Sequence, residues 1–183
     1  MRVDKLQMMN LRDICLSYAV PVSSGQGTEL TINRENFHKA MSEVGIDELD
    51  VDILDQLFTM WDKTGAGFVK VVLFLCGVSP LASTLDVVTK MKFAMEMYDI
   101  KQSGRLSQLD LIMILGGINA TASYFGDACI TPPQIELVVE ECFQGKDEFY
   151  YKENIEYFAT HPSIVLFSNG SGTMRYGTGK SVS

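Results

Sequence analysis

Apolar residues recur at helical spacing just ahead of an aspartate in the first half of the chain. Leu54, Leu57, Phe58 and Trp61 precede Asp62 at intervals of three, one and three positions. Such spacing places apolar side chains on one face of a helix and leaves the other face polar. The pattern therefore predicts an amphipathic helix that ends at the aspartate.

The same pattern returns 37 positions later, ahead of Asp99. Its apolar face consists of Met91, Ala94, Met95 and Tyr98. A fixed period of this length is typical of repeated supersecondary units. Residues that align between the two copies are Gly67 with Gly104 and Val69 with Leu106.

Two weaker copies flank this pair. Ile32 lies 37 positions before Val69, although the first loop, from residue 19 to 36, holds six extra residues. A last copy follows Thr131 and Pro132, a residue pair that favours the start of a helix. The sequence thus predicts an all-α fold of eight helices, arranged as four helix–loop–helix units.

Breaks in the pattern suggest how the units are grouped. The stretch from Gly77 to Thr84 is rich in Gly, Pro and Ser and predicts a helix end followed by a linker. We expect an N-terminal lobe at 1–80, a C-terminal lobe at 81–167 and a Gly- and Ser-rich flexible tail at 168–183. A second irregular stretch is expected from Gly116 to Pro133.

The paired units, the sequence GVSP (77–80) and the sequence KMKFAMEMYD (90–99) together resemble a known family. They are similar to the EF-hand proteins of the calcineurin B, neuronal calcium sensor and calaxin-like branch. The resemblance covers about residues 11–158. It implies two EF-hand pairs, a short two-stranded β bridge between the paired loops, and an apolar surface that captures a helix of a partner. The calaxin-like part further implies a place in the cytoskeleton or in the axoneme of a cilium or flagellum.

The third loop keeps the most groups that a calcium ion could use. An EF-hand supplies oxygens from positions 1, 3, 5, 7, 9 and a bidentate Glu at 12. Here Lys101 occupies position 3, and Asp110 at position 12 is one methylene shorter than Glu. The loop is therefore interpreted as a remnant whose aspartate caps backbone donors, with weak Ca²⁺ or Mg²⁺ binding as the alternative. Its candidate ligands are Asp99, Ser103, Arg105, Ser107 and Asp110.

The other three loops have fewer residues that could bind a calcium ion. Ala66 and Leu73 replace ligands in the second loop, and the first loop is too long for ordinary EF-hand geometry. The fourth loop is aligned to start at Phe143 and to end at Asn154. We therefore expect no metal or other cofactor.

An apolar groove for the helix of a partner is predicted instead of an ion site. Methionines suit such grooves because they are flexible, although a Met stripe also fits an ordinary core. The groove residues expected from the sequence are Phe58, Trp61, Phe74, Met91, Met95 and Tyr98.

Composition narrows the classes of partner and compartment. The net charge of −8 disfavours nucleic acid and anionic membranes as partners, and no apolar run is long enough for membrane insertion. The four cysteines have no CxxC pair, so a reduced, cytoplasmic protein is expected. No catalytic residues are predicted, because His38 and His161 have no nucleophile or base at a recognisable spacing.

The sequence leaves two possible functions. The first is a non-catalytic, largely calcium-independent adaptor or structural subunit of a complex, which binds an amphipathic helix of a larger protein. The second is a Ca²⁺ or Mg²⁺ sensor that uses the third loop, Asp99 to Asp110.

Overall fold

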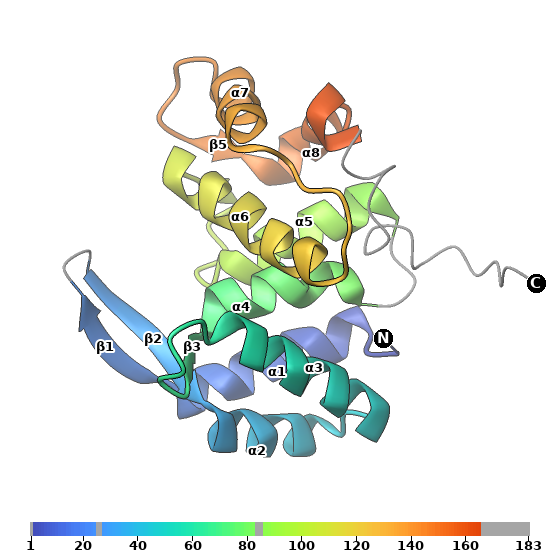
Figure 1. Ribbon diagram of the computed structural model, residues 1–183. Helices are drawn as coiled ribbons and strands as arrows, with labels where there is room; N and C mark the ends of the chain where they lie inside the picture. The colour runs from blue at the N-terminus through green and yellow to red at the C-terminus, as the bar shows by residue number, and fades with distance from the viewer. Residues whose placement is uncertain (1, 25–26, 83–85, 166–183) are drawn as a thin grey trace, which may run out of the picture.

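The computed structural model describes residues 2–24, 27–82 and 86–165 (Figure 1). This part of the chain is mostly helical, with two small antiparallel sheets. The helices are α1 (Lys5–Tyr18), α2 (Arg34–Val44), α3 (Glu48–Trp61), α4 (Val71–Val78), the short 3-10 helix η1 (Ser79–Leu81), α5 (Val87–Tyr98), α6 (Gln108–Tyr124), α7 (Pro132–Phe143) and α8 (Tyr151–Ala159). The strands are β1 (Val20–Ser24), β2 (Gly27–Asn33), β3 (Phe68–Lys70), β4 (Arg105–Leu106) and β5 (Phe149–Tyr150).

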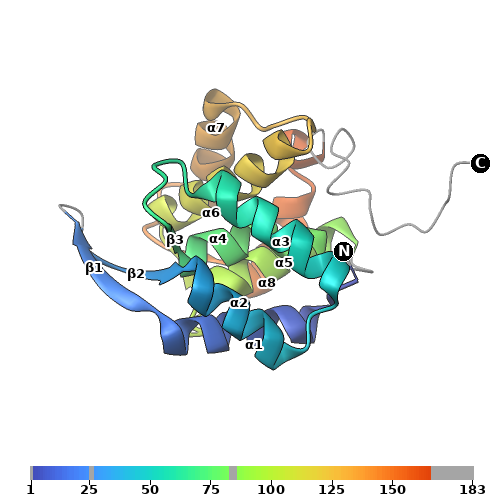
Figure 2. The same ribbon diagram turned by 60° about the horizontal axis from the view of Figure 1, so that its bottom comes forward.

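The first sheet has three strands in the order β1-β2-β3, where the sequence predicted two. Ile32 of β2 stands opposite Val69 of β3, so the two positions that the 37-residue repeat aligns face each other in the sheet. The extra residues of the first loop fold back as the β1–β2 hairpin, which extends from the helical body in both views (Figures 1 and 2). The insertion therefore adds a strand to the predicted bridge.

The second sheet joins β4 to β5 and has two strands, as expected. Leu106 stands opposite Phe149, and both side chains are buried. A fourth loop that starts at Phe143 would put Tyr150, and not Phe149, opposite Leu106. The predicted alignment of the fourth loop was therefore wrong by one position. The distance from the helix cap to the strand differs between the two loops. In the third loop Leu106 lies seven positions after the cap of α5, Asp99. In the fourth loop Phe149 lies only five positions after the cap of α7, Gln144, because α7 extends through Phe143.

Helix starts follow the local sequence. The side chains of Asn33, Asp86 and Ser107 each accept a hydrogen bond from the backbone N–H three residues later, which satisfies a donor that the first turn leaves unpaired. Thr131 precedes Pro132 at the start of α7, as predicted, and its N–H donates to the side chain of Gln134.

The segment from Gly77 onward ends a helix, as predicted, but its described part is packed rather than exposed. Helix α4 ends at Val78 and η1 follows directly. Ser79 and Ala82 are completely buried, and the Ser79 hydroxyl donates to the carbonyl of Cys76. Here the link between the predicted lobes forms part of the core.

The irregular stretch predicted from Gly116 to Pro133 is helical over its first half, because α6 continues to Tyr124. Tertiary contact explains the difference. Gly117 packs against Leu73 and Trp61, and a Cβ atom on it would lie 3.4 Å from atoms of both side chains. This packing offsets the low helix propensity of glycine. The remaining loop is fixed by Asn119, whose side-chain amide pairs with both the N–H and the C=O of Ile130.

Contacts between α4 and α6 join the two predicted lobes (Figure 1). The helices cross at Gly77 and Gly117, where a Cβ on Gly77 would lie 2.6 Å from the carbonyl oxygen of Gly117. A second link connects α1 to α5. There Arg12, 3% exposed, donates to the carbonyl of Glu96, and Lys5 pairs with the Glu96 carboxylate at 2.6 Å.

The buried residues form one continuous hydrophobic cluster across both halves of the described chain. The lobe boundaries at 80 and 81 remain a prediction about sequence organisation. The tail predicted at 168–183 lies outside the described residues. In the part of the chain that the structure describes, no helix is both long and apolar enough to cross a membrane.

Candidate functional site

The Asp99 carboxylate organises the third loop. It lies at the end of α5 and is 8% exposed. Oδ1 accepts hydrogen bonds from the N–H (3.0 Å) and the hydroxyl (3.1 Å) of Ser103, and Oδ2 accepts one from the N–H of Gly104 (2.8 Å). The backbone of Gly104 has a φ of 76°, a conformation that glycine adopts without strain. The capping role expected from the sequence is what the geometry shows.

Burial and hydrogen bonding act in opposite directions on Asp99. Burial raises the pKa of the carboxyl, whereas the bonds from Gly104, Ser103 and Tyr151 lower it, and the net shift of the pKa is downward. Asp99 is therefore ionised at neutral pH and its charge is balanced by protein donors.

The other predicted ligands of the third loop are engaged elsewhere. The carbonyl of Arg105 lies 3.1 Å from the Ser103 hydroxyl, which shares its one proton between this oxygen and Asp99, and the Arg105 side chain pairs with Glu148. Asp110 accepts from both the N–H and the hydroxyl of Ser107 at 2.8 Å, which forms the capping box of α6. Position 12 thus caps a helix in this structure.

Tyr98 also faces Asp110. Burial raises the pKa of the Tyr98 phenol to about 12, and the charge of Asp110 and a hydrogen bond to it add to the effect. The phenol is thus protonated at physiological pH, and its hydroxyl can donate to Asp110.

The donor set of this loop does not match the one that calcium requires. Calcium takes six to eight oxygens, with several carboxylates among them. Lys101 places an ammonium at position 3, and the stem of Lys152 passes over Gly104, its Cδ 3.5 Å from where a Cβ would stand. Within the described ranges, no group of three or more His, Cys, Asp or Glu residues is arranged to hold a metal ion.

The second loop has the same internal geometry. Asp62 accepts hydrogen bonds from the N–H of Ala66 at 3.0 Å and from that of Gly67 at 2.7 Å. Leu73, at the position of the usual Glu, packs toward Gly117 of α6. Two loops that differ in sequence thus close through the same use of a first-position aspartate.

Most of the predicted groove residues belong to the core. Phe58, Phe74, Met91 and Met95 are 0% exposed, whereas Trp61 and Tyr98 are partly exposed. Phe58 and Phe74 pack with Phe37, and Trp61 packs edge-on against Phe74 at 5.8 Å between ring centroids. In this arrangement the six residues do not form an open groove.

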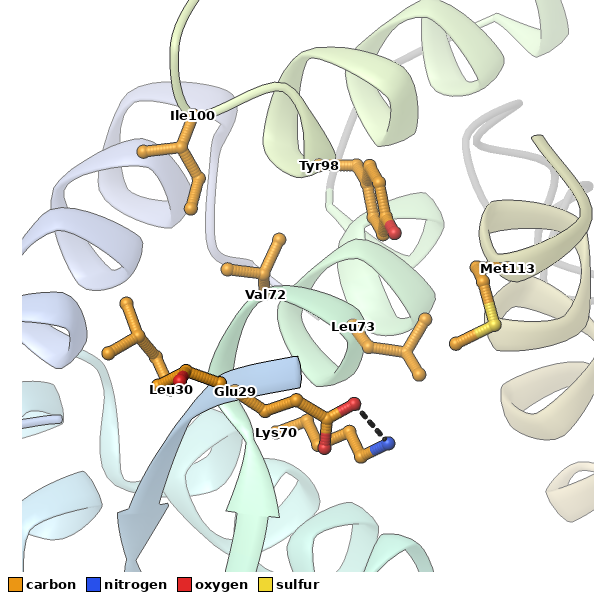
Figure 3. Close-up of a pocket in the computed structure, with 9 residues that line it drawn as sticks. Glu29, Leu30, Lys70, Val72, Leu73, Tyr98, Ile100 and Met113 are labelled. Carbon is orange, nitrogen blue, oxygen red and sulfur yellow. Dashed lines mark hydrogen bonds and ion pairs between the residues drawn. The ribbon is translucent and has the colours of Figure 1, made fainter. Parts of the chain in front are cut away.

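An apolar pocket does open next to Tyr98, between the β1–β2 hairpin and the helices α4 and α6 (Figure 3). Its volume is about 310 Å³. The ion pair between Glu29 and Lys70, 2.8 Å long, lies at one side. The apolar lining consists of Leu30, Val72, Leu73, Tyr98, Ile100 and Met113.

Only Tyr98 of this lining was predicted from the sequence. Ile100 carried a signal, because it is an apolar residue in a loop where polar residues are expected, and it is 41% exposed. Leu30 could not be found, since its position depends on how the hairpin folds. The pocket is formed by segments far apart in the sequence.

Each histidine lies near a carboxylate. Nε2 of His38 lies 2.7 Å from Asp55, and Nε2 of His161 lies 3.1 Å from Glu141. His38 belongs to α2, whereas His161 follows the end of α8. The four cysteines are unpaired thiols.

Comparisons with known proteins give one distant match. No family model matches the chain. Over 85 residues the chain is 29% identical to the calcium-binding protein NCSA of Dictyostelium discoideum. The match covers 46% of this chain and 44% of the relative, so the chain spans less than half the length of that protein. The similarity supports a relationship of EF-hand type and agrees with the helical fold.

Proposed function

We propose that this protein is a non-catalytic adaptor of EF-hand type, which binds an amphipathic helix of a larger protein without needing calcium. Two helices joined through one strand occur three times in the described chain, and α1 and α2 are joined through two strands; the strands pair as the loops of EF-hand pairs do. On this proposal the four segments are EF-hand units whose loops have lost their ions.

The observation that carries the proposal is the open face of α6. This helix is apolar on nearly all sides over its first two and a half turns, from Leu109 to Ile118. A helix of that kind is normally covered on all sides. Leu109 and Ile112 are nevertheless 66% and 40% exposed, and Met113 is partly exposed.

The spacing of the open face suits another helix. Leu109, Ile112, Met113 and Gly116 follow the i, i+3, i+4, i+7 rule, so they form one stripe along α6. Gly116 has open space where a Cβ would stand, which permits close approach of a second helix. Met113 also lines the pocket, so the stripe and the pocket are continuous.

Substitutions on the stripe test the proposal. The full chain is used to isolate partners from a native extract, with identification by mass spectrometry, for the wild type and for Ile112→Lys. Leu137→Lys on α7 is the matched control, because Leu137 is 45% exposed but lies on another helix. We expect a specific partner to be lost with Ile112→Lys and kept with Leu137→Lys.

A direct measurement completes the test. A peptide that spans the contacting segment of the partner should become helical on binding and bind at least tenfold more weakly to Ile112→Lys. Equal binding to the two variants contradicts the proposed surface. Self-association through the stripe, measured by sedimentation, would contradict a foreign helix as the occupant.

A calcium or magnesium sensor is the second candidate, and the similarity to a calcium-binding protein favours it. In that case the third loop binds the ion and changes the packing of its helices. Isothermal titration separates the candidates. The adaptor predicts no heat at micromolar calcium, and the sensor predicts heat that disappears in Asp99→Ala.

The absence of catalysis, the cytoplasmic location and a place in the cytoskeleton or axoneme stay predictions from the sequence. Identification of the partner in the same isolation experiment tests the location, since an axonemal or cytoskeletal protein is the expected result.

A further inference from the structure

The Asp99 carboxylate accepts hydrogen bonds on both of its oxygens. A carboxylate offers about four lone-pair sites on its two oxygens. Oδ1 accepts a hydrogen bond from the N–H of Ser103, and the single proton of the Ser103 hydroxyl is shared between Oδ1 and the carbonyl of Arg105. Gly104 fills one site on Oδ2 at 2.8 Å, and the hydroxyl of Tyr151 fills the other at 3.2 Å.

The donor from Tyr151 differs from the other three, because it comes from another unit. Tyr151 is the first residue of α8, 52 positions after Asp99, and is 1% exposed. Its backbone N–H donates to the carbonyl of Gly104 at 3.2 Å. One residue thus holds the third loop at two points, one through the backbone and one through the side chain.

The second loop provides a contrast. The hydrogen bonds to Asp62 come from Thr64, Ala66 and Gly67 of its own loop. The pair formed by the first and second loops is joined by the longer three-stranded sheet. The pair formed by the third and fourth loops has only two residues per strand, so a further tie contributes more there.

We propose that the hydroxyl of Tyr151 is an internal clasp, which closes the third loop onto α8 and replaces the contribution that a bound cation makes to an EF-hand pair. In a metal-binding loop, the free energy of ion binding offsets the cost of ordering the loop. Ion binding is therefore coupled to folding. Here a neutral hydroxyl reaches the first-position aspartate from the neighbouring unit. The fourth donor keeps Asp99 satisfied when no ion is present.

The state of the two groups agrees with a donor and an acceptor. Burial and the nearby Asp99 raise the pKa of Tyr151, so its hydroxyl keeps the proton at neutral pH. Burial of the pair excludes water that would otherwise replace the bond. The bond therefore joins a protonated phenol to an ionised carboxylate.

Tyr151→Phe tests the clasp, because it removes the hydroxyl and keeps the ring. Tyr150→Phe is the matched control, since Tyr150 is the preceding residue, is 48% exposed and has a hydroxyl that interacts only with the exposed side chains of Glu148 and Arg105 among the described residues. We expect the melting temperature, measured with chelator, to fall by about 5 °C in Tyr151→Phe. In Tyr150→Phe it should change by less than about 1 °C.

Two further measurements make the result specific. In an Asp99→Asn background the effect of Tyr151→Phe should shrink to less than half, because the partner of the hydroxyl has changed. Equal effects of the two Phe variants, or an undiminished effect in Asp99→Asn, would overturn the clasp. So would a rise of about 5 °C or more in the wild type on addition of calcium, because the ion would then hold the loops.

This inference does not depend on a partner. Well below its melting temperature, Tyr151→Phe should still bind the helix that the α6 stripe binds. The clasp and the proposed adaptor function can therefore fail separately.

Discussion

Trp61 occupies the point where three helices meet. Its ring lies over the crossing of α4 and α6, because the indole carbon Cζ2 would be 2.5 Å from a Cβ on Gly77. The buried Nε1 has no hydrogen-bond partner among the described residues. A buried donor without a partner costs free energy, so the benefit of this side chain comes from the packing of its ring.

Truncation of Trp61 should therefore be costly, and loss of its N–H should not. Trp61→Ala is expected to lower the free energy of unfolding by about 3 kcal/mol, whereas Trp61→Phe changes it by about 1 kcal/mol or less. Urea denaturation followed by circular dichroism measures both. A loss in Trp61→Phe as large as that in Trp61→Ala would contradict packing of the ring as the source of the stability.

Acidification should weaken the third loop through Asp99. The folded state lowers the pKa of this carboxyl below the value of about 3.9 in an unfolded chain. Its contribution to stability is thus complete above that value and is lost as the pH falls toward the folded pKa.

Comparison with Asp99→Asn isolates this effect. The difference in unfolding free energy between the wild type and Asp99→Asn should be constant from pH 6 to pH 8 and should decrease below about pH 4. Denaturation curves at each pH provide the measurement. A difference that grows on acidification would contradict the direction of the shift.

At the scale of elements, α6 shows how tertiary contact changes a local expectation. Two glycines in succession, followed by Asn and Thr, favour a break in a helix. The structure continues α6 through them, and Gly117 packs against Leu73 and Trp61 at the crossing with α4. The same crossing requires Gly77, where a side chain has no room.

Alanine substitutions at Gly77 of α4 and at Gly116 of α6 should change the stability of the protein in opposite directions. Gly77→Ala places a methyl group 2.6 Å from the carbonyl oxygen of Gly117, and we expect a loss of about 2 to 3 kcal/mol. Gly116 lies on α6, where a Cβ would meet open space, so Gly116→Ala is expected to stabilise the protein by up to about 1 kcal/mol. Chemical denaturation of the two variants checks the contrast, and equal effects would disprove the tight crossing.

At the scale of the whole molecule, the two predicted lobes share a core. The interface includes the α4–α6 crossing and the bonds from Lys5 and Arg12 of α1 to Glu96 of α5. The buried apolar cluster has members from both halves. Neither half can unfold without exposing apolar surface on the other.

Unfolding should accordingly be a single cooperative transition. Differential scanning calorimetry should give a ratio of calorimetric to van't Hoff enthalpy near one. Glu96→Ala, which removes the bond to Lys5 but keeps the carbonyl that Arg12 uses, should lower the melting temperature and leave one transition. Two resolved transitions in the wild type would instead favour independent lobes.

The sequence by itself determined the helices that end at Asp62 and Asp99 and the start of α7 after Thr131, because these depend on spacing and on neighbours along the chain. It also indicated that Asp99 caps backbone donors of its own loop, since Ser103 and Gly104 lie within five residues of it. Tertiary structure decided which apolar residues are exposed. Helical spacing identifies an apolar face but not what covers it, so Phe58 and Met91 were expected in a groove and lie in the core. The pocket at Leu30 and Ile100, the crossing at Gly77 and the contact of Tyr151 with Asp99 each join residues that only the folded chain brings together.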